Sequence, residues 1–207
     1  VYTMGRPHAQ RQSEIIQSAL ALAGELGVQK VTTQAIADRV GIAQATVFRH
    51  FKSRDAIFAA VIEWLSAQLS ETLQPCFTSQ SGRADDRLRL LIARQLELIS
   101  HHRGMPRMLF SDRLHLESPM LKETVQKIIF NYIEQLTGLI NEGIQSGQFK
   151  PDLDAQATAK MVAALIQGTV MRWSLFDFNF KLEAQADLLQ TFVLNSVAMP
   201  AVSGNNS

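Results

Sequence analysis

Cysteine is nearly absent from this sequence. Cys76 is the only one among 207 residues, which excludes an intramolecular disulfide framework and a metal site built from several thiolates. Clustered cysteine and histidine, Glu-x-x-His pairs and a glycine-rich phosphate loop are missing as well, so the sequence predicts no metal and no cofactor. A chain that does without disulfides suits a reducing compartment, and we expect a cytoplasmic protein.

Long apolar segments are also missing. The longest nearly apolar stretch, MVAALIQGTVM, has eleven residues and lies between Lys160 and Arg172. This is too short to span a bilayer. No basic segment followed by an apolar run and a small-residue cleavage site is present either, and we expect neither a secretory leader nor a membrane partner.

The sequence shows neither strand-like alternation nor an internal repeat. Apolar residues instead recur at helical spacing almost everywhere, as in the stripe of Glu14–Leu26 and in a long segment from about Arg54 to the Leu73 region. The pattern predicts an all-α protein of about nine helices. Three short or medium helices fall within residues 1–52, and longer helices follow.

Charge is unevenly distributed along the chain. Residues 1–54 hold 7 Lys/Arg against 3 Asp/Glu, whereas residues 55–207 hold 13 against 16. The overall net charge of +1 conceals this difference. A basic N-terminal quarter on a mildly acidic body indicates that one end of the molecule meets a polyanion.

Residues 33–52 fit a helix-turn-helix. Gly41 falls in the turn, where a positive φ is needed. Four apolar residues are spaced to form a small core between two helices: Ile36, Val40, Ile42 and Val47. The second helix, about Gln44–Phe51, is mostly polar, so it has little to bury within its own domain and must present its polar side to something else.

The segment TTQAIADRVGIAQATVFRHFKSRDAIFAAV resembles the DNA-binding region of the TetR family of bacterial repressors, which typically reads T-x-x-x-I-A-x-x-x-G-V-s-x-g-t-l-Y-x-H-F-x-x-K-x-x-L. The likeness covers roughly residues 10–62, and the rest of the chain is similar in layout only. The resemblance implies a helix-turn-helix DNA-binding domain of three helices at residues 1–53 and a helical ligand-binding and dimerisation domain at 54–200. The polar tail at 201–207 is expected to be disordered.

In this family the second helix of the motif lies in the DNA major groove. The resemblance implies a DNA-binding set of nine residues: Thr33, Gln44, Ala45, Thr46, Phe48, Arg49, His50, Lys52 and Arg54. Gln44 suits adenine and Arg49 suits guanine, whereas Thr33, His50, Lys52 and Arg54 are expected at phosphates. Phe48 departs from the family pattern, because the usual Tyr carries a hydroxyl that often reaches a phosphate.

Ligand pockets in this family lie inside the helical body. An aromatic and methionine-rich set predicts such a pocket here, because methionine adapts to irregular shapes and Gln167 can orient a polar group. The candidate residues are Trp64, Met105, Met108, Phe110, Phe130, Tyr132, Ile133, Gln167 and Trp173. Ordinary core packing is the alternative interpretation of each. The near absence of charge in the set favours an apolar or aromatic ligand.

A homodimer is expected, because a helix-turn-helix protein reads two half-sites about one helical turn apart, roughly 34–36 Å. The segment from about 154 to 177 is apolar on two sides and must be covered on both. One of these stripes, together with the final helix, predicts the dimer interface. It comprises Met161, Ala164, Leu165, Gly168, Met171, Arg172, Leu175, Leu188, Phe192 and Val193.

The sequence therefore predicts a ligand-responsive repressor that binds a palindromic double-stranded DNA operator as a homodimer. An apolar or aromatic small molecule in the body would release it. Two alternatives stay open: a DNA-binding regulator without a small-molecule effector, and an all-α enzyme that carries the motif. The missing nucleophile, paired acids and metal ligands argue against an enzyme.

Overall fold

The computed structural model describes residues 8–78 and 82–199. In these two ranges the chain forms nine α-helices and no strand beyond an isolated bridge between Phe149 and Ala198. The helices are α1 (His8–Leu26), α2 (Thr33–Val40), α3 (Gln44–His50), α4 (Arg54–Thr78), α5 (Ala84–Ser100), α6 (Gly104–Leu109), α7 (Pro119–Gln145), α8 (Ala155–Leu175) and α9 (Ala186–Val197). The predicted all-α fold is confirmed, and the tail expected at 201–207 lies outside the described residues.

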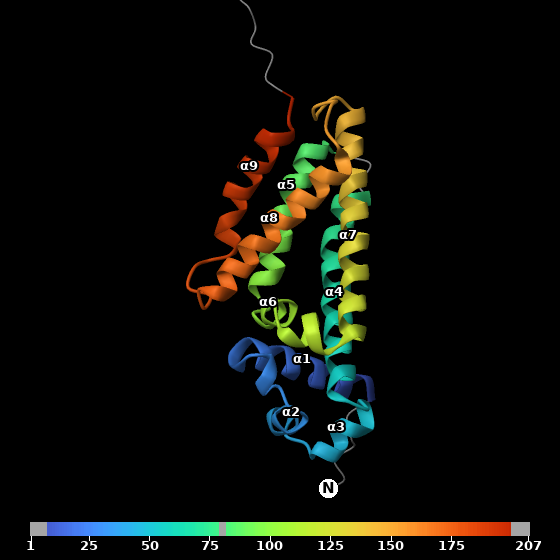
Figure 1. Ribbon diagram of the computed structural model, residues 1–207, viewed down its shortest axis with the longest axis vertical. Coiled ribbons are helices and arrows are strands. Elements are labelled where there is room, and N and C mark those ends of the chain that lie inside the picture. The colour runs from blue at the N-terminus through green and yellow to red at the C-terminus, as the bar shows by residue number, and fades with distance from the viewer. Residues whose placement is uncertain (1–7, 79–81, 200–207) are drawn as a thin grey trace, which may run out of the picture.

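The first three helices form a head at one end of the molecule (Figure 1). α2 begins where the side chain of Thr32 accepts a hydrogen bond from the amide of Ala35 at 3.0 Å, as N-cap threonines do. It ends at Gly41, whose φ of 73° lies in the left-handed region that glycine enters at little cost. This turn places α3 against α2 and completes the predicted helix-turn-helix.

α4 leaves the head and runs through the body beside α7 (Figure 1). The sequence predicts that Pro75 closes this helix, but α4 continues through Pro75 to Thr78. A helix end leaves backbone carbonyls without intrahelical partners. Here the carbonyl oxygens of Cys76 and Phe77 both accept hydrogen bonds from the guanidinium of Arg87, at 2.9 Å. Because Arg87 belongs to α5, the local pattern around Pro75 does not reveal the extra turn.

The segment between α5 and α7 forms two short helical pieces. α6 begins at Gly104, and a π-helical turn follows at Arg113–Glu117, called the π turn below. A Cβ atom on Gly104 would lie 2.1 Å from the backbone oxygen of Leu20 on α1. Only glycine permits this approach, so α6 lies directly against the head.

Two groups of buried apolar side chains form the core. One fills the body between α4, α5, α7, α8 and α9. The other joins Ile36 and Val47 of the head to Met108 of α6 and Val125 of α7. Head and body therefore share packed side chains, and a shift of α6 or α7 is felt in the head. None of the helices in the described ranges is long and apolar enough to cross a membrane.

Candidate DNA-reading surface, effector cavity and the joint between them

α3 is anchored on one side and open on the other. Val47 is fully buried and Phe51 is 8% exposed, so these two side chains fasten the helix to the head, as the sequence predicts. Ala45, Phe48 and Arg49 are exposed. The side chain of Phe48 is 47% exposed, so it belongs to the open side of the helix and not to the core of the head.

Hydrogen bonds within the motif hold two of the expected reading residues in place. The amide nitrogen of the Gln44 side chain donates to Thr33 Oγ1 at 2.8 Å, and Arg49 Nη2 donates to Thr46 Oγ1 at 3.2 Å. All four side chains belong to the predicted DNA-binding set. A surface that is ordered before binding loses less conformational entropy when a partner arrives.

His50, at the end of α3, stacks against His8 at the start of α1, with 4.4 Å between the ring centroids. Its Nδ1 is buried and has no hydrogen-bond partner among the described residues. Burial lowers the pKa of His50, and the positive charges of His8, Arg49 and Arg11 lower it further. This histidine therefore resists protonation until an anion approaches.

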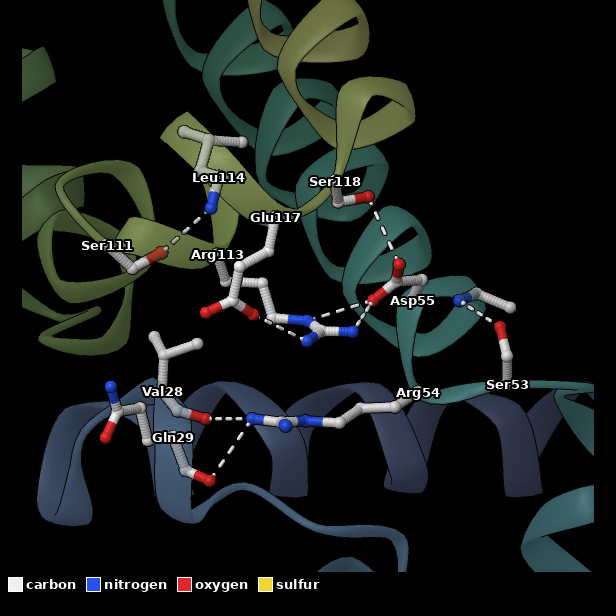
Figure 2. A network of polar contacts seen from close by, with 11 residues as sticks. Val28, Gln29, Ser53, Arg54, Asp55, Ser111, Arg113, Leu114, Glu117 and Ser118 are labelled. Carbon is white, nitrogen blue, oxygen red and sulfur yellow. Dashed lines mark hydrogen bonds and ion pairs between the residues drawn. The ribbon is translucent and has the colours of Figure 1, made fainter.

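Lys52 is exposed beyond α3, but Arg54 turns into the joint between head and body. Its guanidinium donates hydrogen bonds to the backbone oxygens of Val28 and Gln29 (Figure 2). The phosphate contact expected of Arg54 stays a prediction. In the free chain this side chain instead connects the first residue of α4 to the segment between α1 and α2.

Asp55 is the centre of a polar network in the same joint (Figure 2). Its carboxylate accepts hydrogen bonds from Arg113 of the π turn, where the Nε donor lies 2.9 Å from Oδ1, and from Ser118 Oγ at 3.1 Å. Arg113 also pairs with Glu117 at 2.9 Å. Ser118 precedes α7, but its side chain makes no cap bond and holds Asp55 instead. The network fastens the start of α4 to the π turn and to α7.

An apolar cavity of about 110 Å³ lies between α4, α5, α6, α7 and α8. Five of the nine predicted pocket residues line it: Met105, Met108, Phe110, Tyr132 and Gln167. Tyr132 Oη donates a hydrogen bond to Gln95 Oε1 at 2.7 Å, and burial raises the pKa of Tyr132. This pair, Gln167 and Ser66 are polar groups in a mostly apolar wall. The sequence did not predict the aliphatic part of that wall, which includes Ile62, Leu65, Ile128, Ile166 and Val170.

The other four predicted pocket residues lie elsewhere. Trp64 packs edge-on against His102, with 5.3 Å between ring centroids. Phe130 is 63% exposed, and Ile133 packs against the body core. Trp173 is buried in that core, where its Nε1 donates to the backbone oxygen of Phe180 at 2.9 Å. Aromatic character alone did not distinguish a cavity wall from ordinary core or surface.

An exposed apolar stripe runs along α8 and α9. From the predicted interface set it contains Met161, Ala164, Gly168, Met171, Leu175, Leu188 and Phe192. The exposed fractions of Leu175, Leu188 and Phe192 are 73%, 67% and 61%. Leu165 is half-buried, Arg172 is exposed and donates to Gln185, and Val193 is buried in the core of its own subunit. Scattered exposed apolar residues are common, but a continuous stripe indicates a contact surface.

Comparisons with known proteins agree with this arrangement. The family described as bacterial regulatory proteins, tetR family, matches residues 15–61. The region described as YsiA-like protein, C-terminal region, matches residues 67–196. The fatty acid metabolism regulator protein of Bacillus subtilis (strain 168) is 25% identical over 186 residues, which cover 89% of this chain and 94% of that protein.

Two solved structures show the same fold. The transcriptional regulator FadR from Bacillus subtilis in complex with stearoyl-CoA has a TM-score of 0.75 at 23% identity, covering 89% of this chain and 98% of that chain. The SmeT–triclosan complex has a TM-score of 0.75 at 21% identity and covers 93% of each chain. The helix-turn-helix head and the helical body thus occur together in these regulators.

Proposed function

This chain belongs to the TetR family of bacterial regulatory proteins, and we propose that it is a ligand-responsive repressor. A dimer binds a palindromic operator through the exposed side of α3. A small apolar molecule binds inside the body and favours a state whose two heads no longer match the half-sites. DNA and effector then each lower the affinity of the protein for the other by the same factor, because the coupling free energy between two sites is reciprocal. This activity requires no catalytic step.

The observation that carries the proposal is the position of α6. Met105 and Met108 line the cavity, while Gly104 lies against Leu20 of the head at a distance that leaves no room for a Cβ atom. A molecule that fills the cavity presses on a helix that cannot move without moving α1. Packed interiors transmit such displacements because they compress little.

The size and lining of the cavity support an apolar effector that binds by shifting a conformational equilibrium. Ligand pockets commonly measure roughly 300–1,000 Å³, whereas this cavity measures about 110 Å³. An effector of ordinary size would therefore bind a state of the body with a wider cavity, and its binding would favour that state. Stearoyl-CoA and triclosan, which the two similar regulators bind, each contain a large apolar part: an acyl chain in the first and aromatic rings in the second.

The same small cavity favours a second candidate, a DNA-binding regulator that responds to no small molecule. In that case the space between α4 and α8 is a packing defect of about 110 Å³, and apolar voids of this kind stay empty. The two candidates share the DNA-reading surface. They differ in whether any apolar compound weakens operator binding.

Electrophoretic mobility shift with DNA from upstream of the protein's own gene tests the DNA-binding function. We expect Gln44→Ala and Arg49→Ala each to weaken operator binding by about 1–3 kcal/mol, because each removes a side chain suited to a base edge. Arg83→Ala is the matched control, since Arg83 lies at the far end of the body beside Asp85. Equal binding by all three variants would contradict the proposed role of α3.

A further inference from the structure

A second hollow adjoins the apolar cavity and has the opposite character. This polar cleft measures about 510 Å³, and its charged lining residues are Arg54, Arg107, Asp112, Arg113 and Glu117. Phe110 lines both the cavity and the cleft, so the two spaces border the same residue. A molecule that passes Phe110 would have one end among aliphatic side chains and the other among arginines.

Two of these arginines face the same aromatic ring. The guanidinium carbon of Arg54 lies 5.1 Å from the centroid of the Phe58 ring, and that of Arg113 lies 5.9 Å from it. Phe58 is 1% exposed, so both cations border an apolar surface where water screens charge poorly. Like charges gathered in this way attract an anion more strongly than an exposed arginine does.

The three cations of the cleft differ in how they are neutralised. Arg113 pairs with Asp55 and Glu117, and Arg107 pairs with Asp177 at 3.3 Å. Arg54 donates only to backbone oxygens, and within the described ranges it forms no ion pair. Its Nε is buried without a hydrogen-bond partner there.

An anion bound to Arg54 would supply the ion pair that this guanidinium lacks among the described residues. Burial lowers the pKa of Arg54 and the neighbouring charge of Arg113 lowers it further, while the carboxylates of Asp55 and Glu117 act in the opposite direction. A half-buried cation that no carboxylate contacts directly is costly, and a carboxylate or phosphate oxygen bound to it would offset that cost through a charge-assisted hydrogen bond. The open volume of the cleft gives such a group access.

We propose that the effector of this regulator is a single-chain amphiphile whose apolar tail occupies the cavity and whose anionic head binds Arg54 in the polar cleft. This rests on the proposed function, because it specifies the molecule that the body senses. The apolar tail enlarges the cavity. The anionic group of the amphiphile replaces solvent around Arg54 and competes with Asp55 and Glu117 for Arg113.

The anionic group of the effector would lie at the joint that orients the DNA-binding head. Arg54 is the first residue of α4 and is bonded to Val28 and Gln29 of the head, while Arg113 holds Asp55 at the same helix end (Figure 2). An anion that draws either guanidinium toward itself loosens the joint through which the head is oriented. An uncharged apolar effector would act through α6 alone.

A series of amphiphiles with one tail and three head groups tests the proposal. Decanoate, decanol and decyltrimethylammonium are titrated into the full chain by isothermal titration calorimetry. We expect decanoate to bind at least about tenfold more tightly than decanol, the ratio that one charge-assisted hydrogen bond supplies. The cationic compound is expected to bind more weakly than decanol.

Arg54→Gln shows whether this preference arises in the cleft. The substitution keeps a donor for the carbonyl of Val28 and removes the charge, so the affinity for decanoate should fall to within about twofold of the affinity for decanol. Arg83→Gln removes the same charge at a remote exposed site and should leave the tenfold preference intact. Unchanged decanol binding and an unchanged circular dichroism spectrum show that the Arg54 variant is folded.

The outcomes separate this inference from the proposed function. If decanol binds and decanoate binds no better, the proposed contact between an anionic group and Arg54 is wrong, and the same holds if the preference survives Arg54→Gln. The proposal of an apolar effector is unaffected by either result. Tightest binding by decyltrimethylammonium would assign the cleft to a cation held by Glu117. If no compound binds, the amphiphile proposal falls, and operator binding still tests the DNA-reading role independently.

Discussion

Protonation of His50 is expected to have opposite effects on the folding stability of the head and on its affinity for DNA. Its ring stacks on His8, and its pKa is lowered by burial first and then by the charges of His8, Arg49 and Arg11. In the unfolded chain the same histidine takes up a proton near its ordinary value, about pH 6.5. Acid therefore favours the unfolded state, whereas the phosphate contact predicted for His50 would favour its protonated form.

These opposite linkages give a pH prediction. As pH falls from about 7.5 to about 5.5, the unfolded state binds more protons than the folded state, so the free energy of unfolding decreases. Operator affinity should rise over the same range, because binding to phosphate takes up a proton. Urea unfolding and fluorescence anisotropy with labelled operator measure the two quantities.

His50→Gln should reduce both pH dependences, and His101→Gln, at an exposed histidine after α5, should change neither. An operator affinity that falls with acid in the wild-type chain would place His50 away from phosphate.

The positions of some side chains could be predicted from the sequence, and those of others could not. Val47 and Phe51 could be identified as anchors because their spacing places them on the buried side of a short helix, and both are buried. Arg54 could not be placed in the joint. Its partners are the backbone oxygens of Val28 and Gln29, and their position depends on how the chain returns to α1.

At the scale of elements, the ion pair between Asp55 and Arg113 joins the start of α4 to the π turn. We expect a double-mutant cycle of Asp55→Asn and Arg113→Gln in urea unfolding to give a coupling energy of about 1–2 kcal/mol, typical of contacting partners. The pair is half-buried, with side chains 30% and 23% exposed, so water screens it incompletely.

The pair Arg83–Asp85, whose arginine side chain is 63% exposed, is the control, and its cycle should give less than about 0.5 kcal/mol. Equal coupling in the two cycles would show that the joint contributes no more than a surface ion pair.

The elements themselves were predictable where local signals decide them. Gly41 ends α2 at the predicted turn. Thr32 and Asp154 begin α2 and α8 as N-caps, and the Asp154 side chain accepts from the amide of Ala157 at 2.9 Å. The extension of α4 beyond Pro75 and the division into α6 and the π turn were not predicted. Both depend on contacts with other helices, made by Arg87 and Gly104.

At the scale of the molecule, the stripe on α8 and α9 should form the homodimer. We expect Leu188→Glu to convert the dimer to a monomer in sedimentation velocity, because the substitution places a charge in a contact that apolar burial stabilises. Leu188 is 67% exposed in the single chain, so the fold of the subunit should not suffer. Affinity for a palindromic operator should fall with the dimer.

Phe130→Glu is the matched control. Phe130 is similarly exposed, at 63%, but lies on α7, and its substitution should leave the dimer intact. A dimer that survives Leu188→Glu and dissociates with Phe130→Glu would move the interface to α7.

The all-α fold, the helix-turn-helix and the apolar stripes could be read from the order of residues, because helical periodicity, caps and turn glycines act over a few neighbouring positions. The cavity wall, the polar cleft and the orientation of Arg54 required the tertiary structure. Each of these sites is assembled from helices distant in the sequence, and an apolar residue at helical spacing looks the same whether it faces a cavity, a core or a partner subunit.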